Sequence, residues 1–376
     1  MDKECTQEKV TTMNVTFKEE FYLESGRILS PVTIAYETYG TLNNDKNNAI
    51  LVCHALTGSA HASGISHDSN TEGWWSEMVG KGKPIDTERY FVICSNILGS
   101  CYGSTGPSSI DPYTGCRYGL KFPVVTIRDM VKAQKKLLDY LGINQIFCVI
   151  GGSLGGMQSL EWSLTFPEIV ANSIVISAAG RITPMAMAFN TVGRYAVLKD
   201  PNWQNGNYYD KTPPKDGLAI ARMAGHITYL SDISFNQKFG RKLGHQDSIF
   251  DFFSAYEVEN YLRYNGYKFT ERFDANSYLY LLKAMDIFDI SYGYGSYTEA
   301  LKRIKANSLF IDFTTDFLFP AYQMDEMCDI MKEYGNNVER VTIESDHGHD
   351  AFLLEFEDLS AVILSFLEKA WRMHNV

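Results

Sequence analysis

Residues 151–156 read GGSLGG and constrain the fold of this chain more than any other segment. They lie between a strand-like apolar run, IFCVI at 146–150, and a helix-like run, MQSLEW at 157–162. Gly-x-Ser-x-Gly between a strand and a helix is a nucleophile elbow, a tight turn that holds a serine hydroxyl clear of the backbone. Glycines are needed beside the serine because side chains there would clash. Ser153 is therefore the first candidate nucleophile. The alternative at this point is that glycine and serine simply fill a loop.

The composition excludes several classes of protein. The 376 residues fit one α/β domain with an insertion, or two domains, and the net charge of −11 argues against binding to nucleic acid. No run of about 18 apolar residues is present, which predicts that no segment spans a membrane. The polar, acidic start MDKECTQEKV lacks the pattern of a secretory signal. We expect a cytoplasmic protein.

The seven cysteines show neither disulfide nor metal-site spacing. Cys53, Cys94 and Cys148 lie inside strand-like runs, where a thiol behaves as a small apolar group. We therefore expect free thiols and no metal site.

Strand-like and helix-like segments alternate along most of the chain. Residues 16–41 alternate in a strand-like way and end at the turn Asn43-Asn44-Asp45, which predicts antiparallel strands. Later runs have the character of buried parallel strands, at 49–53, 90–95, 146–150, 174–177, 309–313 and 338–344. Helix-like segments fall between or after them, at 127–141, 157–166, 322–334 and 359–373. This order predicts an α/β fold with a mostly parallel, doubly wound sheet.

Residues 184–300 break this alternation. They contain helix-like segments joined by turns rich in Asn, Asp and Gly, and they are far longer than a crossover connection requires. We predict a helical lid at 184–300, inserted above the carboxyl edge of the sheet, and a catalytic core formed by 1–183 and 301–376.

Two residues follow the late strands where a serine-dependent site needs them. In the α/β-hydrolase arrangement the acid and the histidine come after the serine, each on a loop at the carboxyl end of a later strand. Asp316 follows the strand at 309–313, and His349 follows the strand at 338–344. We predict that His349 accepts the Ser153 proton and that Asp316 orients the imidazole.

Each of these two residues has a competitor nearby. Asp312 lies inside its strand, which is typical of a buried carboxylate with a partner. His347 lies two residues before His349 and could serve as the base, but the glycine that precedes His349 lets the backbone bring that ring close. Asp316 and His349 are therefore preferred.

An oxyanion hole requires two backbone N–H donors. The residue after the nucleophile, Leu154, supplies one. The loop after the strand at 49–53 supplies the other, and Leu56 is the candidate. His54 and Thr57 could cap the same turn without changing this role, because only the backbone is used.

With these residues in place, the chain resembles the homoserine O-acetyltransferase family of α/β-hydrolase-fold enzymes, which acts in methionine biosynthesis. The likeness covers nearly the whole chain, with AYETYGTLN at 35–43, CHALTG at 53–58, residues 90–107, FDANSY at 273–278 and GHDAFLLE at 348–355. The elbow GGSLGGMQSLEW carries Leu154 where the family more often has methionine.

The resemblance implies a ping-pong reaction with acetyl-CoA as co-substrate and without a permanently bound cofactor. Acetyl-CoA acylates Ser153, CoA leaves, and the homoserine hydroxyl, deprotonated by His349, attacks the acyl-enzyme. The resemblance also implies a homodimer formed through the lid.

Helical spacing offers a site for the acceptor. In the segment 217–231 it places Arg222, His226 and Tyr229 on one face. An arginine can bind a carboxylate through two parallel hydrogen bonds. The resemblance implies that Arg222 binds the substrate carboxylate with Tyr229 nearby, and that Asp350 receives the substrate ammonium. From the pattern alone, a solvated helix face and a surface aspartate are the alternative.

Other activities stay open on the same residues. The chain reads Phe317-Leu318-Phe319 where the family often has tryptophan and tyrosine, so its acyl donor and acceptor preference can differ. The alternatives are a homoserine O-succinyltransferase, a serine O-acyltransferase, or an esterase or thioesterase that uses water. A binding protein on an inactive hydrolase fold is disfavoured because all three triad candidates are present. The glycines lack the spacing of a dinucleotide-binding loop.

Overall fold

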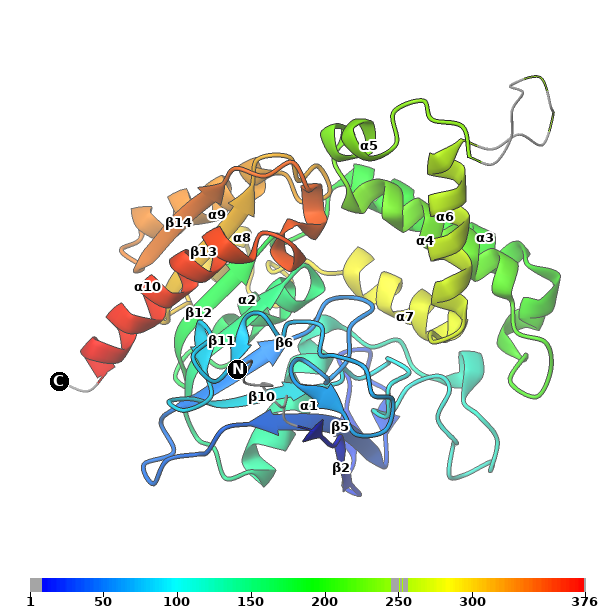
Figure 1. Ribbon diagram of the computed structural model, residues 1–376. Coiled ribbons are helices and arrows are strands. Elements are labelled where there is room, and N and C mark those ends of the chain that lie inside the picture. Colours follow the sequence, from blue (N-terminus) through cyan, green and yellow to red (C-terminus); the bar gives the residue numbers. More distant parts are fainter. Residues whose placement is uncertain (1–8, 245–249, 251, 253–255, 375–376) are drawn as a thin grey trace, which may run out of the picture.

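An eight-stranded sheet forms the centre of the molecule (Figure 1). The computed structural model describes residues 9–244, 250, 252 and 256–374, so part of the polar N-terminal segment lies outside the described residues. From edge to edge the strands are β14 (Val338–Ile343), β13 (Asn307–Phe313), β12 (Val170–Ile176), β11 (Ile146–Gly152), β6 (Ala49–Cys53), β10 (Phe91–Ser95), β5 (Val32–Tyr39) and β2 (Met13–Phe17). All pairings from β14 to β10 are parallel, and β5 pairs antiparallel with both β10 and β2. The predicted sheet is confirmed.

Helices cover both faces of the sheet. In β6 the side chains of Ala49, Leu51 and Cys53 belong to one hydrophobic core, and those of Ile50 and Val52 belong to the other. This alternation is the period of two expected for a strand buried on both faces. The first core also receives side chains from α1 (Ile127–Tyr140), α2 (Leu154–Thr165) and α9 (Ala321–Glu333), and the second receives those of α10 (Phe356–His374).

Short elements and loops join the early strands. The strands β3 (Phe21–Tyr22) and β4 (Ile28–Leu29) form an antiparallel hairpin. Two further pairs of short strands are parallel. These pairs are β1 (Lys9–Val10) with β7 (Ile65–Ser66) and β8 (Val79–Gly80) with β9 (Ile85–Asp86). The 3₁₀ turn η1 (Gly119–Lys121) precedes α1.

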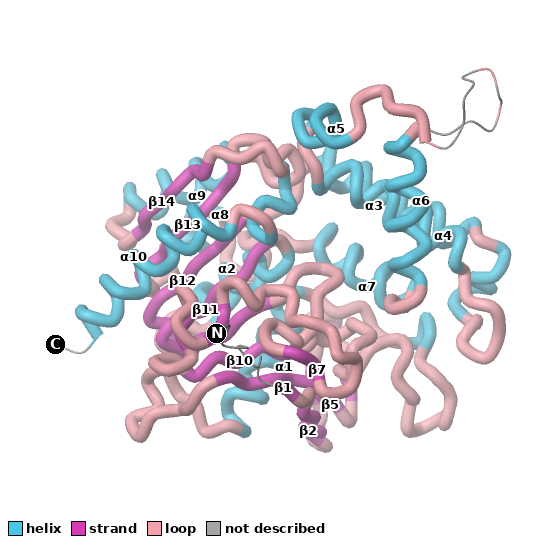
Figure 2. The backbone as a smooth tube through the Cα atoms, in the orientation of Figure 1, coloured by secondary structure: helices cyan, strands magenta, loops and turns pink. Residues whose placement is uncertain are grey.

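The described residues between β12 and β13 form helices and no strand, as Figure 2 shows. Its elements are α3 (Pro184–Lys199), η2 (Pro201–Gly206), α4 (Lys215–Tyr229), α5 (Asp232–Lys238), α6 (Glu257–Thr270), α7 (Ala275–Asp286) and α8 (Tyr297–Leu301). In Figure 1, α3, α4 and α6 project beyond the end of the sheet, and α7 lies between them and the core. The predicted helical character of 184–300 is confirmed for its described residues, whereas 245–249, 251 and 253–255 lie outside them.

Two element boundaries differ from the sequence-based ones. Helix α2 begins at Leu154, three residues before the predicted start at 157, because the glycines 155 and 156 continue the helix despite their poor helix propensity. Strand β12 begins at Val170 rather than 174. The six described cysteines are free, and no helix in the described part of the chain is long and apolar enough to cross a bilayer. The 3₁₀ turn η3 (Gly348–Leu353) completes the carboxyl edge.

Candidate active site

Ser153 lies at the junction of β11 and α2 in a strained conformation. Its φ of 58° and ψ of −124° are rarely adopted by a residue with a side chain. A Cβ added at Gly155 would lie 2.0 Å from the Cys53 carbonyl oxygen, and one at Gly152 would lie 2.6 Å from the Phe352 ring. Glycine is therefore required on both sides of the serine, as the sequence predicted.

The two predicted oxyanion donors belong to two different segments beside Ser153. Leu154 is the first residue of α2, so its N–H has no acceptor within the helix. Leu56 lines the same small cavity as Ser153. Buried Gln158 donates hydrogen bonds from Nε2 to the carbonyl oxygens of His54 and Leu154, both at 3.2 Å. It ties the loop after β6 to the start of α2. Sequence reasoning missed Gln158 because a buried glutamine in a helix follows no recognisable pattern.

His54 supports this loop as a neutral side chain. Its Nδ1 lies 2.8 Å from the Ala55 carbonyl oxygen, and its Nε2 lies 3.1 Å from the Ile97 backbone nitrogen. Nε2 must accept that bond, so Nδ1 carries the proton. Burial lowers the pKa of His54 to about 4, which keeps the ring uncharged.

Asp316 and His349 meet at the carboxyl ends of β13 and β14. Asp316 Oδ2 lies 2.8 Å from His349 Nδ1, and Asp316 Oδ1 accepts the backbone N–H groups of Leu318 and Phe319 at 3.0 and 2.9 Å. Both side chains are almost fully buried, at 0% and 3% exposure. Burial opposes protonation of His349, but the adjacent carboxylates, chiefly Asp316, outweigh it and raise its pKa.

The loops that carry this pair are fixed to each other. The Thr315 hydroxyl donates to the Ser345 carbonyl oxygen at 2.6 Å and accepts the Gly348 N–H at 3.0 Å. Gly348 has a φ of 68°, and a Cβ there would lie 2.7 Å from the Ser231 backbone nitrogen. The sequence indicated the need for glycine at 348, but nothing marked Thr315.

The two competitors make other contacts. Asp312 is buried inside β13 and forms an ion pair with Arg340, whose Nε donates at 2.7 Å. His347 is 44% exposed, and its Nε2 lies 3.7 Å from a carboxylate oxygen of Glu355. The structure therefore brings His349, and not His347, to Asp316.

Shared neighbours place Ser153 close to His349. Phe352 contacts the Gly152 backbone, and its ring centroid lies 5.8 Å from that of His349. Phe319 lies 5.2 Å from His349, ring to ring, and lines the small cavity together with Ser153. The hydrogen bonds among the described residues do not include one between Ser153 and His349. Such bonds are often long before substrate binds.

The cavity beside Ser153, here called the inner cavity, has a volume of about 40 Å³. Leu56, Leu318 and Phe319 line it from the core, and α3, α4 and α7 close it from the other side. It is therefore enclosed between the carboxyl edge of the sheet and the helical insertion.

Opposite charges flank His349 without pairing. Arg222 Nη1 lies 3.5 Å from the Tyr229 hydroxyl, and its guanidinium lies over the Tyr229 and Phe269 rings, at 5.1 and 4.8 Å. Tyr229 stands 6.2 Å from His349, ring to ring. Among the described residues, neither Arg222 nor Asp350 forms an ion pair. Burial raises the pKa of Asp350, although His349 and Arg222 act against this rise.

His226 lies beside Tyr229, with ring centroids 5.6 Å apart, and also contacts α6. Its Nδ1 lies 3.1 Å from the Tyr261 hydroxyl on α6, and burial, with help from Arg222, lowers its pKa to about 3. On the helical face predicted to carry these three residues, Arg222 and Tyr229 therefore contact each other, and His226 contacts Tyr261 of α6.

Known proteins of similar sequence and structure give this geometry a family. A model of the α/β-hydrolase fold matches residues 48–356. A homoserine O-acetyltransferase from Deferribacter desulfuricans is 67% identical over 370 residues. The match covers 98% of this chain and 98% of that protein. The chain belongs to the homoserine O-acetyltransferase family. The crystal structure of a homoserine O-acetyltransferase from Bacillus anthracis superposes with a TM-score of 0.89 at 31% identity, covering 96% of this chain and 98% of that one.

A structural neighbour carries a different activity in its name. Esterase E22 has a TM-score of 0.88 at 33% identity, and the match covers 95% of this chain and 100% of that one. The shared fold therefore accommodates both homoserine O-acetyltransferases and an esterase. No cluster of three or more His, Cys, Asp or Glu side chains suited to a metal ion occurs among the described residues.

Proposed function

We propose that the protein is a homoserine O-acetyltransferase that works through an acetyl-Ser153 intermediate. The observation that carries this proposal is the Asp316–His349 pair beside the strained Ser153 elbow, flanked by unpaired Arg222 and Asp350. The 67% identity to a homoserine O-acetyltransferase over almost the whole chain supports the choice of substrates.

In the first half-reaction His349 Nε2 takes the Ser153 proton while Oγ attacks the thioester carbonyl of acetyl-CoA. The N–H groups of Leu56 and Leu154 stabilise the oxyanion. The intermediate collapses, the C–S bond breaks, and His349 returns the proton to the leaving CoA thiolate. Asp316 holds the ring orientation and stabilises the imidazolium.

In the second half-reaction His349 takes the proton of the homoserine hydroxyl, whose oxygen attacks the acetyl-serine. Collapse breaks the ester bond to Ser153, which regains the proton. Arg222 binds the α-carboxylate, with Tyr229 beside it, and Asp350 receives the α-ammonium. A zwitterionic substrate would pair both charges that the free protein leaves unpaired.

The inner cavity favours acetyl over succinyl. Its lining includes no Lys, Arg or His among the described residues, so a succinyl carboxylate would have to compete for Arg222, which the proposal assigns to homoserine. A second candidate function, an esterase that uses water as the acceptor, has support from the likeness to esterase E22.

Thiol release from acetyl-CoA tests the proposal, with homoserine, serine or no acceptor, and with succinyl-CoA in parallel. Release that depends on homoserine and acetyl-CoA is expected. Equal release without an acceptor would favour the esterase, and faster release with serine or succinyl-CoA would change the acceptor or the donor.

The helical insertion 184–300 has two further proposed roles. As a lid it would exclude water from the acyl-enzyme, because α3, α4 and α7 close the inner cavity. As a dimer interface it offers exposed apolar side chains, with Val192 and Tyr195 of α3 at 55% and 58% exposure and Ile220 of α4 at 49%. Light scattering should give the mass of two chains, and a monomer would contradict this. The cytoplasmic location also stays a prediction.

A further inference from the structure

A second, larger cavity lies on the other side of the oxyanion loop. This outer cavity, of about 710 Å³, is lined by Thr57 and Gly58 of that loop, by Trp74, and by Tyr102 and Arg272. Its lining also includes His61, Glu72 and several hydroxyl side chains: those of Thr12, Ser59, Ser66, Ser69 and Thr71. The mechanism above uses none of these side chains.

The outer cavity adjoins the inner one. Leu56 faces the inner cavity, whereas the next two residues of the chain face the outer one. A row of aromatic rings separates the two spaces. Tyr102 packs against Phe273 at 5.7 Å, and Phe273 packs against Tyr278, which lines the inner cavity, at 6.4 Å. A long ligand in the outer cavity would therefore reach Ser153 only by passing Leu56 and this aromatic row.

Arg272 gives the outer cavity an available positive charge. Its Nη1 donates to the Tyr102 hydroxyl at 2.6 Å and to the Thr57 carbonyl oxygen at 3.2 Å. It is exposed and forms no ion pair with a described carboxylate. Arg128, beside another cavity of about 240 Å³, differs because Glu24 and Glu161 neutralise it.

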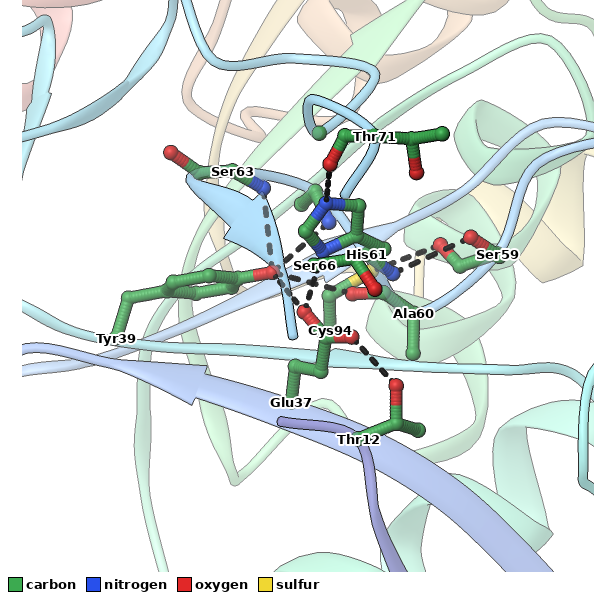
Figure 3. Close-up of polar contacts among 12 residues, drawn as sticks. Thr12, Glu37, Tyr39, Ser59, Ala60, His61, Ser63, Ser66, Thr71 and Cys94 are labelled. Atoms are coloured by element: carbon green, nitrogen blue, oxygen red, sulfur yellow. Dashed lines mark hydrogen bonds and ion pairs between the residues drawn. The ribbon is translucent and has the colours of Figure 1, made fainter. Parts of the chain in front are cut away.

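In the floor of the outer cavity the negative charge of Glu37 is compensated (Figure 3). Buried Glu37 accepts hydrogen bonds from Thr12 Oγ1 and the Tyr39 hydroxyl, both at 2.7 Å, and from His61 Nδ1 at 2.9 Å. His61 Nε2 faces the Thr71 carbonyl oxygen at 3.0 Å. Both ring nitrogens of His61 thus face acceptors, which requires the imidazolium. Its charge offsets that of Glu37, and Glu72 also lines the cavity.

We propose that the outer cavity binds the phosphate-bearing part of acetyl-CoA, with Arg272 as the phosphate ligand, while the thioester reaches Ser153 past Leu56. This proposal rests on the proposed function. A guanidinium binds phosphate through charge-assisted hydrogen bonds, and the hydroxyl groups of Ser59 and Ser66, which accept backbone N–H groups, can supply further donors. The long pantetheine arm would cross the aromatic row between the two cavities. On a chain of net charge −11, a local cation of this kind is what an anionic donor needs.

The test compares three acyl donors in the wild type and in Arg272→Gln. Acetyl-CoA carries all the phosphates, S-acetyl-dephospho-CoA lacks the 3′-phosphate, and S-acetylpantetheine lacks every phosphate. KM and kcat are measured by thiol release with saturating homoserine. In Arg272→Gln we expect the KM for acetyl-CoA to rise about tenfold. The KM for S-acetylpantetheine, and the kcat with acetyl-CoA and with S-acetylpantetheine, should be nearly unchanged.

Two further variants make the result specific. Arg272→Lys should recover part of the affinity for acetyl-CoA, because it keeps the charge. Arg263→Gln, an exposed arginine of the same insertion bonded to Asn260, is the matched control and should behave as the wild type.

The outcomes that overturn the proposal are distinct. An equal loss with all three donors would mean that Arg272 acts through Thr57 on the oxyanion loop, and no loss would mean that the phosphates bind elsewhere. Calorimetric titration with CoA separates these from a failure of the proposed function. If CoA binding depends on Arg272 but the wild type transfers no acetyl group, the proposed function alone is wrong. If Arg272→Gln transfers acetyl as well as the wild type, the outer-cavity assignment alone is wrong.

Discussion

Two histidine–carboxylate pairs in this molecule have nearly the same geometry and different surroundings. His349 Nδ1 lies 2.8 Å from Asp316, and His61 Nδ1 lies 2.9 Å from Glu37. His61 Nε2 also faces a carbonyl oxygen, whereas the described residues offer His349 Nε2 no hydrogen bond. The second nitrogen decides the chemistry. An imidazole with both nitrogens bonded to acceptors stays protonated, and one with a free Nε2 can exchange a proton with substrate.

The side chains around the two histidines also differ: aromatic rings surround His349, and polar groups surround His61. The rings of Tyr229, Phe319 and Phe352 surround His349, with centroids 5.2 to 6.2 Å away, and leave Asp316 as its hydrogen-bond partner. Hydroxyl and carbonyl groups surround the His61–Glu37 pair. A histidine beside a carboxylate is therefore not enough to identify a catalytic base.

Activity should separate the two pairs most strongly. His349→Gln should lower kcat by about 10⁴-fold, because it removes the base used in both half-reactions. His61→Gln, its matched control, should lower kcat by less than about tenfold, since that ring only supports the floor of the outer cavity. Thiol release under saturating substrates measures both. Comparable losses in the two variants would remove the distinction.

Loss of His61, which should affect activity little, should lower the stability of the fold. His61→Ala leaves the Glu37 charge buried and without its cation, so the free energy of unfolding should fall by about 3 kcal/mol. The double variant Glu37→Gln/His61→Gln should lose less, because no buried charge remains. Urea denaturation measures both values. If the double variant lost as much as His61→Ala, the cost would come from packing and not from charge.

The two pairs should respond oppositely to rising pH. The pKa of His349 is raised, and the base must be neutral to act, so kcat/KM should rise with pH and reach half its maximum above about 6.5. Hydrogen bonding to Glu37, against the effect of burial, also raises the pKa of His61. Its stabilising contribution is present below the unfolded pKa and is lost as pH rises through the folded pKa.

The pKa of Glu37 sets the lower pH limit of the stability that the His61–Glu37 pair contributes. Burial alone would raise its pKa, but the hydrogen bonds from His61, Thr12 and Tyr39 together lower it. The contribution of Glu37 is therefore lost as pH falls through its folded pKa. The stability difference between the wild type and the Glu37→Gln/His61→Gln variant should be largest between these two folded pKa values. A constant difference across pH would mean that the pair is not ionised in the folded protein.

Sequence reasoning predicted the Asp316–His349 contact because both residues are tied to a topological rule. The carboxyl ends of parallel strands meet at one edge, so a residue just after each late strand must lie near the elbow. The catalytic roles of Ser153, Asp316 and His349, and those of Arg222, Tyr229 and Asp350, stay predictions until they are measured.

The supporting contacts could not be predicted in this way. Glu37 and His61 are separated by 24 positions and lie on different elements, so only the folded chain shows that they pair. Gln158 and Thr315 act through side-chain bonds to backbone groups of other loops. Helix propensity also misplaced the start of α2, since packing against Cys53 requires glycine inside its first turn.

The most direct test of the account is to locate the acetyl group on the enzyme. The protein is mixed with acetyl-CoA without homoserine, quenched with acid, digested, and its peptides are measured by mass spectrometry. The account predicts one added acetyl group on the peptide that contains Ser153, its loss on addition of homoserine, and no acetylation of that peptide in Ser153→Ala. Transfer to homoserine that proceeds at full rate in Ser153→Ala, or an acetyl group on another residue that homoserine removes, would contradict it.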